Sequence, residues 1–109
     1  MEEKNPLENL GKHLNHLNQC FQKCKQSSID DVKFQNNLNA ILEQLSVSKV
    51  VDNKLLISLE KFYQASSFLI GLSTLKLDER TYKAWRMYDS FHFDYIKPKL
   101  QLYGPTIVL

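Results

Sequence analysis

Glycine, proline and cysteine are all scarce in this sequence. Its 109 residues include three glycines, three prolines and two cysteines. The glycines and prolines separate regular segments and do not form a low-complexity stretch. A chain of this length makes one domain with a single modest core. Cys20 and Cys24 lie four residues apart in a helical pattern, so we expect two free thiols and a reducing, intracellular setting.

Long hydrophobic runs are also missing. No stretch approaches the roughly 18 apolar residues that a membrane-spanning helix needs. The first ten residues are acidic and lack the apolar segment of a signal peptide. The sequence contains no Asn-x-Ser/Thr acceptor for N-glycosylation. These absences lead us to expect no membrane contact and a cytoplasmic or nuclear location.

Charge of one sign does not dominate the chain either. The net charge is +2, and acidic and basic residues are spread evenly along the sequence. The overall field is therefore too weak to attract phosphate backbones or anionic lipids strongly. The sequence also lacks a glycine-rich phosphate loop, a nucleophile elbow and a His-Glu-x-x-His pattern. We predict a protein that is not an enzyme and needs no cofactor.

Apolar residues recur at helical spacing through most of the chain. In the first segment they follow a 3-4-3-4-3 spacing, typical of the seam of a bundle or coiled coil, through Leu7, Leu10, Leu14, Leu17, Phe21 and Cys24. Similar stripes follow twice more, so we predict helices over about 5–26, 28–45 and 48–71. Ser28, with Asp31 three residues later, is a cap for the second helix, and Ser48 or Asp52 caps the third. The short first connection predicts an antiparallel hairpin.

A fourth helix is predicted over about 78–97, beginning at the cap residue Asp78. Pro98 should end it, because proline disfavours helical conformation in the residue before it. Residues 98–109 then read as an extended tail. The predicted fold is all-α, an antiparallel helical hairpin extended to a three- or four-helix bundle with an extended C-terminal tail. We assign residues 1–77 to a helical scaffold and residues 78–109 to a docking segment.

Histidine and cysteine gather on the first helix, at His13, His16, Cys20 and Cys24. At about 1.5 Å per residue the set spans about 16 Å, which is too long for one tetrahedral ion. At most one pair four residues apart could supply half a site. We therefore predict no metal site, and a metal-bridged dimer through Cys20 and Cys24 stays as an alternative.

Aromatic residues are concentrated in the docking segment. Phe91 and Phe93 fall outside the stripe that the other rings follow, so the rings occupy far more than one helix face. We infer more ring surface than an isolated chain of this size can bury, and hence a protein partner. Tyrosine, tryptophan and arginine are enriched at interface hot spots. The predicted partner-binding residues are Tyr82, Trp85, Arg86, Tyr88, Phe91, Tyr95 and Tyr103.

Two alternatives compete with a docked partner. The tail could fold back over the aromatic helix within the same chain. Arg80, Lys83 and Arg86 recur at three-residue spacing and could instead bind nucleic-acid phosphates, with nearby rings stacking on bases. Asp78, Glu79, Asp89 and Asp94 nearly cancel the positive charge of the same segment.

The sequence as a whole therefore predicts a helical adaptor that joins other proteins in an intracellular assembly. The regular seam of the first helix would also permit self-association. Residues of the tail, from Lys99 to Tyr103, could pair along the edge of a partner's sheet. In composition the chain resembles the small helical subunits of kinetochore, chromatin and transcription assemblies, although no motif identifies a family.

Overall fold

The computed structural model of the protein describes residues 6–24, 27–72 and 75–102. Helices form the regular structure of these residues, which contain no strand. The elements are α1 (Pro6–Gln22), α2 (Ile29–Val47), α3 (Asn53–Leu72), α4 (Glu79–Phe91), a π-helical turn η1 (His92–Ile96) and α5 (Lys97–Leu102). None of these helices is long and apolar enough to cross a membrane.

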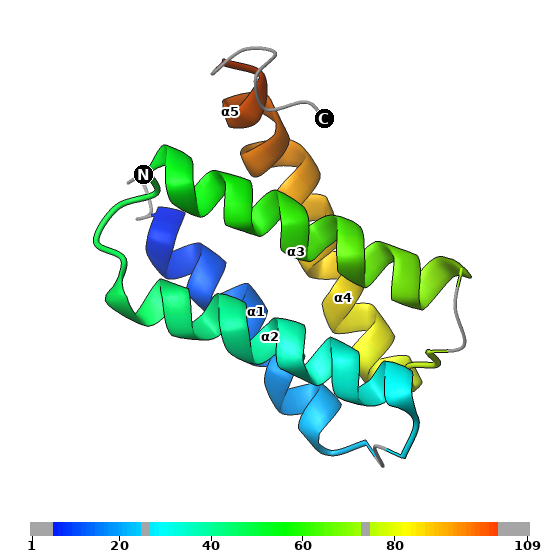
Figure 1. Ribbon diagram of the computed structural model, residues 1–109. Coiled ribbons are helices and arrows are strands. Elements are labelled where there is room, and N and C mark those ends of the chain that lie inside the picture. Colours follow the sequence, from blue (N-terminus) through cyan, green and yellow to red (C-terminus); the bar gives the residue numbers. More distant parts are fainter. Residues whose placement is uncertain (1–5, 25–26, 73–74, 103–109) are drawn as a thin grey trace.

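The helices are arranged in two layers. α2 and α3 run in opposite directions and form one layer, while α1 and α4, also antiparallel, form the other (Figure 1). α4 continues through η1 into α5, and both of these shorter elements contact α3. This arrangement confirms the prediction of an all-α bundle.

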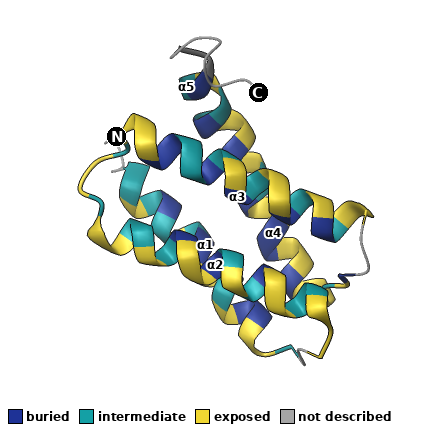
Figure 2. Cartoon of the chain, in the orientation of Figure 1, coloured by how far each residue is buried: buried dark blue, intermediate teal, exposed yellow. Residues whose placement is uncertain are grey.

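The apolar stripes of the first three helices meet between the layers. Buried residues line the inner sides of the helices and exposed residues the outer sides (Figure 2). The seam of α1, which we considered for self-association, is buried inside the bundle at Leu10, Leu14 and Leu17. The rings of Phe21 and Phe34 meet edge to face with centroids 4.8 Å apart and join α1 to α2.

Side-chain caps begin three of the helices at predicted residues. Ser28 Oγ accepts the N–H of Asp31 at 3.0 Å, and the Asp31 carboxylate accepts the N–H of Ser28 at 3.0 Å, which completes a capping box. Asp52 and Asp78 each accept the N–H three residues later at 2.9 Å. Each cap satisfies a backbone donor that the helix leaves free. Asp52 is thus the cap of α3, whereas Ser48 ends α2.

The first helix is shorter than predicted and ends at Gln22. The N–H groups of Lys23 and Cys24 donate to carbonyls three residues earlier, at 3.2 and 2.9 Å. Such bonds tighten the last turn of a helix and end its regular α-helical pattern.

The last helix runs past its predicted end. We expected it to stop near Lys97, but residues 97–102 are helical, so the predicted extended conformation is wrong for residues 98–102. In η1 the N–H of Lys97 donates to the carbonyl of His92, five residues back. α5 begins after this wide turn, and Pro98 falls in its first turn, where a residue without an N–H is tolerated. Residues 103–109 lie outside the described residues.

Candidate functional site

Trp85 and Tyr88, which we predicted as docking anchors, lie in the core. Trp85 is 5% exposed and Tyr88 is 0% exposed. The indole of Trp85 stacks on Tyr63 of α3 with ring centroids 5.8 Å apart and meets Phe62 edge-on at 6.4 Å. α4 packs against α3 through these rings and against α1 on its other side, so its buried arc is wide. Neither side chain offers surface to a partner, which corrects the prediction for these two residues.

Phe91 and Tyr95 are half-buried at the edge of the core. Their rings stack with centroids 5.4 Å apart, and Phe91 also lies 4.9 Å from the ring of His13 on α1. The ammonium of Lys99 lies 4.6 Å from the centroid of the Tyr95 ring. Both rings are thus largely engaged within the chain. Tyr103 lies outside the described residues.

The outer face of α4 is the name that we give to the exposed surface formed by Tyr82, Lys83, Arg86 and Met87 of α4 and by Phe93 of η1, the turn that continues this helix. Tyr82 is 44% exposed, Met87 50% and Phe93 68%. The guanidinium carbon of Arg86 lies 6.0 Å from the centroid of the Tyr82 ring. Tyr82 and Arg86 belong to the predicted docking set and both face solvent, whereas the docking role itself stays a prediction.

Met87 and Phe93 complete this face although we did not predict them as docking residues. Phe93 follows His92 directly, and within η1 His92 is buried while Phe93 is exposed. Met87 lies four residues after Lys83, and Phe93 lies seven after Arg86, which places each pair on one helix face. This spacing was the signal in the sequence that could have found them.

A shallow, open groove lies beside the outer face of α4 and reaches α1. Its lining includes His13, Glu79, Tyr82, Lys83, Arg86 and Met87. Burial lowers the pKa of His13, and the neighbouring His16 lowers it further, so the His13 ring is neutral at neutral pH. Glu79 is the one acidic residue of this set and lies in the first turn of α4, where the helix dipole favours negative charge. The groove thus combines two cations with apolar surface.

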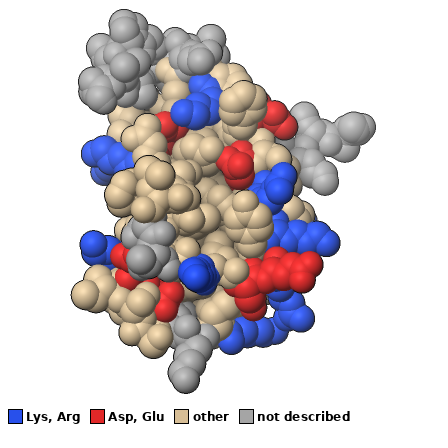
Figure 3. Space-filling model, turned by 90° about the vertical axis from the view of Figure 1, so that its right-hand side faces the viewer, with Lys and Arg blue, Asp and Glu red and all other residues tan. Residues whose placement is uncertain are grey.

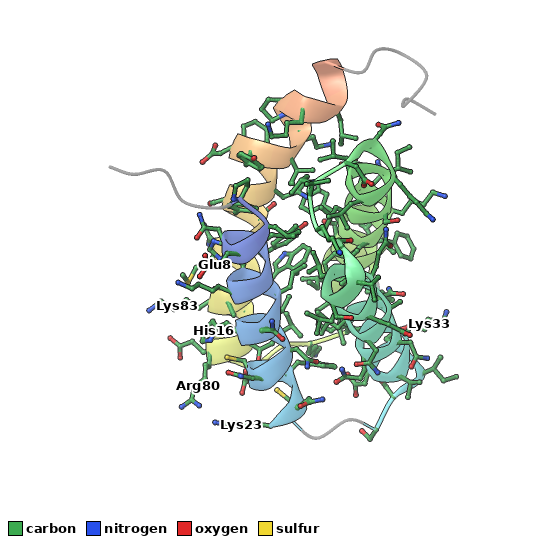
Figure 4. All side chains as sticks on the ribbon, turned by 90° about the vertical axis from the view of Figure 1, so that its left-hand side faces the viewer. Glu8, His16, Lys23, Lys33, Arg80 and Lys83 are labelled. Carbon is green, nitrogen blue, oxygen red and sulfur yellow. The ribbon has the colours of Figure 1, made fainter. Side chains whose placement is uncertain are left out.

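The two cations of this groove, Lys83 and Arg86, form no ion pair with another described residue. Positive and negative side chains are interspersed over the face shown in Figure 3, so no field of one sign covers it. Arg80 and Lys83 project from α4, on the side away from α2 and α3 (Figure 4). Within the described residues, the ion pair joins Glu60 to Lys97, the contact of Glu60 with His92 would be a second one only with a protonated ring, and neither involves Lys83 or Arg86.

A polar network, buried at Tyr88 and His92 and reaching the surface at Gln64 and Lys97, lies on the opposite side of α4, where it meets α3. It consists of Glu60, Gln64, Tyr88, His92 and Lys97. His92 Nε2 lies 2.9 Å from Glu60 Oε1, and His92 Nδ1 lies 2.9 Å from the Tyr88 hydroxyl. Because an ionised carboxylate can only accept, His92 Nε2 carries the proton and Nδ1 accepts from Tyr88. Lys97 Nζ at 3.1 Å and Gln64 Nε2 at 2.7 Å donate to the other oxygen of Glu60.

The environment of the network sets its charge state. Burial lowers the pKa of His92, and the hydrogen bond and charge of Glu60 offset only part of this effect. Partial burial alone would raise the pKa of Glu60, but hydrogen bonds from His92, Lys97 and Gln64 outweigh it and hold that pKa below its usual value. A neutral imidazole therefore bonds to a carboxylate whose charge is balanced by Lys97.

Tyr63 closes the network on its remaining side. Its ring is parallel to the His92 ring within 8°, with centroids 4.0 Å apart, and its hydroxyl donates to Asp89. Burial and this bond to Asp89 raise the pKa of Tyr63 to about 12. Tyr88 and His92 have no exposed surface. Although their alignment with Glu60 resembles a proton relay, a substrate could not reach the hydroxyl or Nδ1 without opening the bundle.

We expect the free energy of unfolding to fall as the pH drops below about 6.5. Unfolded His92 takes up a proton near its ordinary pKa of 6.5, whereas the folded pKa is lower, so acid favours the unfolded chain. The slope approaches about 1.4 kcal/mol per pH unit until the folded pKa is reached. Glu60 should lower the free energy of unfolding further below its ordinary pKa of 4.5, because its folded pKa is also depressed.

Urea unfolding at a series of pH values between about 5 and 8 measures this slope. His92→Gln should remove most of it, and His13→Gln, which changes a less buried ring, should retain most of it. A slope that persists unchanged in His92→Gln would contradict the assignment.

A second exposed apolar patch lies where the start of α2 meets the end of α3. It is formed by Ile29, Val32, Phe68 and Leu72. Phe68 shares a shallow depression with Lys33 of α2, which shows that the two helix ends adjoin. We did not predict this patch, because these four residues lie outside the apolar stripes that we used to assign the core.

The cysteines and histidines of α1 do not form a metal-binding cluster with other residues of the described ranges. No group of three His, Cys, Asp or Glu side chains there could hold an ion. His16 Nε2 and Cys20 Sγ lie 3.8 Å apart, and Cys24 Sγ lies 3.4 Å from Thr81 Oγ1 of α4. Both cysteines are free thiols.

In comparisons with known proteins, no protein-family model, curated protein or solved structure matches the chain. A functional conclusion therefore rests on the fold and on the sites described above.

Proposed function

We propose that this chain is a non-enzymatic helical adaptor that docks another protein through the outer face of α4, as a subunit of a larger intracellular assembly. The supporting observation is the exposure of Tyr82 and Met87 on α4 and of Phe93 on η1, which continues this helix, with exposed Arg86 among them in the sequence. Aromatic residues, methionine and arginine are the types enriched at protein interfaces. Large apolar side chains that share one exposed face favour a binding surface, whereas scattered ones would need no explanation.

The opposite side of α4 supports the same proposal. Trp85 and Tyr88 are packed into the core, and His92 is held by hydrogen bonds at both ring nitrogens. These contacts fix the orientation of the helix, so a partner meets a surface that is already formed. Binding to a preformed surface loses less conformational entropy than binding to a mobile segment.

The alternative is a nucleic-acid module that uses Arg80, Lys83 and Arg86. All three side chains are exposed on α4, which is the observation in its favour. Asp78 and Glu79 lie beside them at the start of the helix, and each phosphate contact gains from a field that stays positive. The ring of Phe93 could stack on a base, but exposed Met87 has no such role, whereas a protein interface uses both side chains. The adaptor is therefore the better-supported function.

Replacing Tyr82 and Phe93 together by alanine should weaken the binding of the partner protein to the chain. Hot-spot side chains each contribute about 2 kcal/mol or more, so we expect capture to fall at least about tenfold. Affinity purification of the tagged chain from its native cells, with quantitative mass spectrometry of the co-purifying proteins, measures the loss. Both residues are exposed, so the far-ultraviolet circular dichroism spectrum should stay unchanged.

The matched control is Ile29→Ala with Phe68→Ala, which removes a similar apolar area from the patch between α2 and α3. The control should retain the partner. If instead the control loses the partner and the α4 variant keeps it, the docking face lies at the α2–α3 end and the proposed site is wrong.

A further inference from the structure

The groove beside α4 has a charge pattern that restricts what can fill it. Lys83 and Arg86 line it without an ion pair among the described residues, and they lie between the exposed residues Tyr82 and Met87. Glu79 is the acidic residue of its lining, and it lies at the N-terminal end of α4. The middle of the groove therefore offers two cations, without a counter-charge from the described part of the chain, next to apolar surface.

A carboxylate is the group that best complements this pattern. Arginine presents a planar fork that binds a carboxylate through two parallel hydrogen bonds, and lysine adds a mobile point charge. A partner that covers Tyr82 and Met87 also removes water from around the cations, and this strengthens their attraction to an acidic side chain. A basic or neutral segment would instead leave Lys83 and Arg86 partly buried without a counter-charge.

We propose that the groove beside α4 binds an acidic, amphipathic segment of a partner protein. Apolar side chains of that segment pack on Tyr82 and Met87, and its aspartate or glutamate side chains pair with Lys83 and Arg86. This inference rests on the proposed function and specifies the chemistry of the partner that the outer face of α4 accepts.

Two other occupants fit the charges less well. A nucleic acid would meet carboxylates at Asp78, Glu79 and Asp94 between the start of α4 and η1, and of Tyr82 and Met87 only Tyr82 offers a ring on which a base could stack. A second copy of the chain, related by a twofold axis through the groove, would bring the two sets of Lys83 and Arg86 toward each other. Like charges brought together in this way oppose association.

The experiment selects ligands from a display library of random 12-residue peptides against the immobilised full chain. Enriched peptides are synthesised with a fluorescent label, and their affinity is measured by anisotropy. We expect enriched peptides to carry acidic residues beside large apolar ones. Lys83→Glu with Arg86→Glu should weaken their binding at least about tenfold. The matched control, Lys33→Glu with Lys61→Glu, makes the same change of charge on exposed positions of α2 and α3 and should alter affinity less than twofold.

The possible outcomes separate this inference from the proposed function. Peptides that lack acidic residues, yet lose binding on Tyr82→Ala with Met87→Ala, would overturn the acidic partner and leave the adaptor standing. A selection in which no peptide depends on the outer face of α4 would overturn both. A labelled 20-nucleotide single strand that binds, and is released by Lys83→Glu with Arg86→Glu, would assign the groove to nucleic acid. Dimerisation that neutralisation of the same two cations, Lys83→Gln with Arg86→Gln, strengthens would assign it to a second copy, because neutral side chains no longer repel across the twofold axis.

Discussion

Replacement of Trp85 by alanine is expected to lower the free energy of unfolding by about 3–5 kcal/mol. Trp85 is 5% exposed and fills the space between α4 and α3. Truncation removes its apolar area from the core and leaves a cavity, because the stacked ring of Tyr63 and the edge-on ring of Phe62 cannot both move into the gap. Urea unfolding followed by circular dichroism at 222 nm, roughly the helix minimum, measures the change.

The control for this experiment is Tyr82→Ala on the same helix. Tyr82 is 44% exposed and faces solvent, so its loss should change the free energy of unfolding by no more than about 0.5 kcal/mol. A stability loss below about 1 kcal/mol for Trp85→Ala would show that the indole is not a core residue, and the docking role predicted from the sequence would then be restored.

The sequence predicted the bundle well because its first three stripes obey a local rule. A residue such as Leu14 or Leu38 recurs with its neighbours at three- and four-residue intervals, and any helix built on that pattern must bury the stripe. The caps are equally local, since Ser28 and Asp78 need only a backbone N–H three residues away. The fold class therefore followed from short-range chemistry.

The candidate site could not be predicted in the same way, because it depends on how many helices surround α4. A helix packed against one neighbour buries a single stripe. On that basis the fourth helix carried more rings than it could bury, and we assigned Trp85 and Tyr88 to a partner-binding surface. α4 lies between α1 and α3, and its buried arc takes both. Of the rings behind the prediction of excess aromatic surface, Tyr82 and Phe93 are exposed, and the partner inferred from that excess stays a prediction.

The wide turn of η1 was the second feature that the sequence did not reveal. Pro98 indicated the end of a helix, yet the π-helical hydrogen bond from Lys97 to His92 places the proline in a new first turn. π-helical turns inside α-helices often occur at functional sites. Here the turn coincides with a buried histidine and an exposed phenylalanine, His92 and Phe93.

Replacement of Glu60 by alanine is expected to lower the free energy of unfolding by about 3 kcal/mol, which is the upper end of the cost of an orphaned buried donor. The N–H of His92 loses its acceptor inside a site with no exposed surface, and Lys97 and Gln64 lose theirs at its rim. Glu60→Gln keeps a carbonyl oxygen for the imidazole and removes only the charge, so about 1 kcal/mol is expected. Glu43→Ala, an exposed acid on α2, should stay within about 0.5 kcal/mol.

The pKa of His92 in the Glu60→Ala protein distinguishes two causes of lower stability, loss of the hydrogen bond to His92 and general loss of packing. The carboxylate of Glu60 raises that pKa and so opposes the effect of burial. Its removal should therefore lower the pKa of His92 further in the folded Glu60→Ala protein, and an NMR titration of the imidazole carbons measures the shift. A cavity alone would admit water and move the pKa in the opposite direction, toward 6.5. An upward shift in Glu60→Ala, or equal stabilities of the alanine and glutamine variants, would therefore mean that Glu60 fills space and does not act as the acceptor that orients His92.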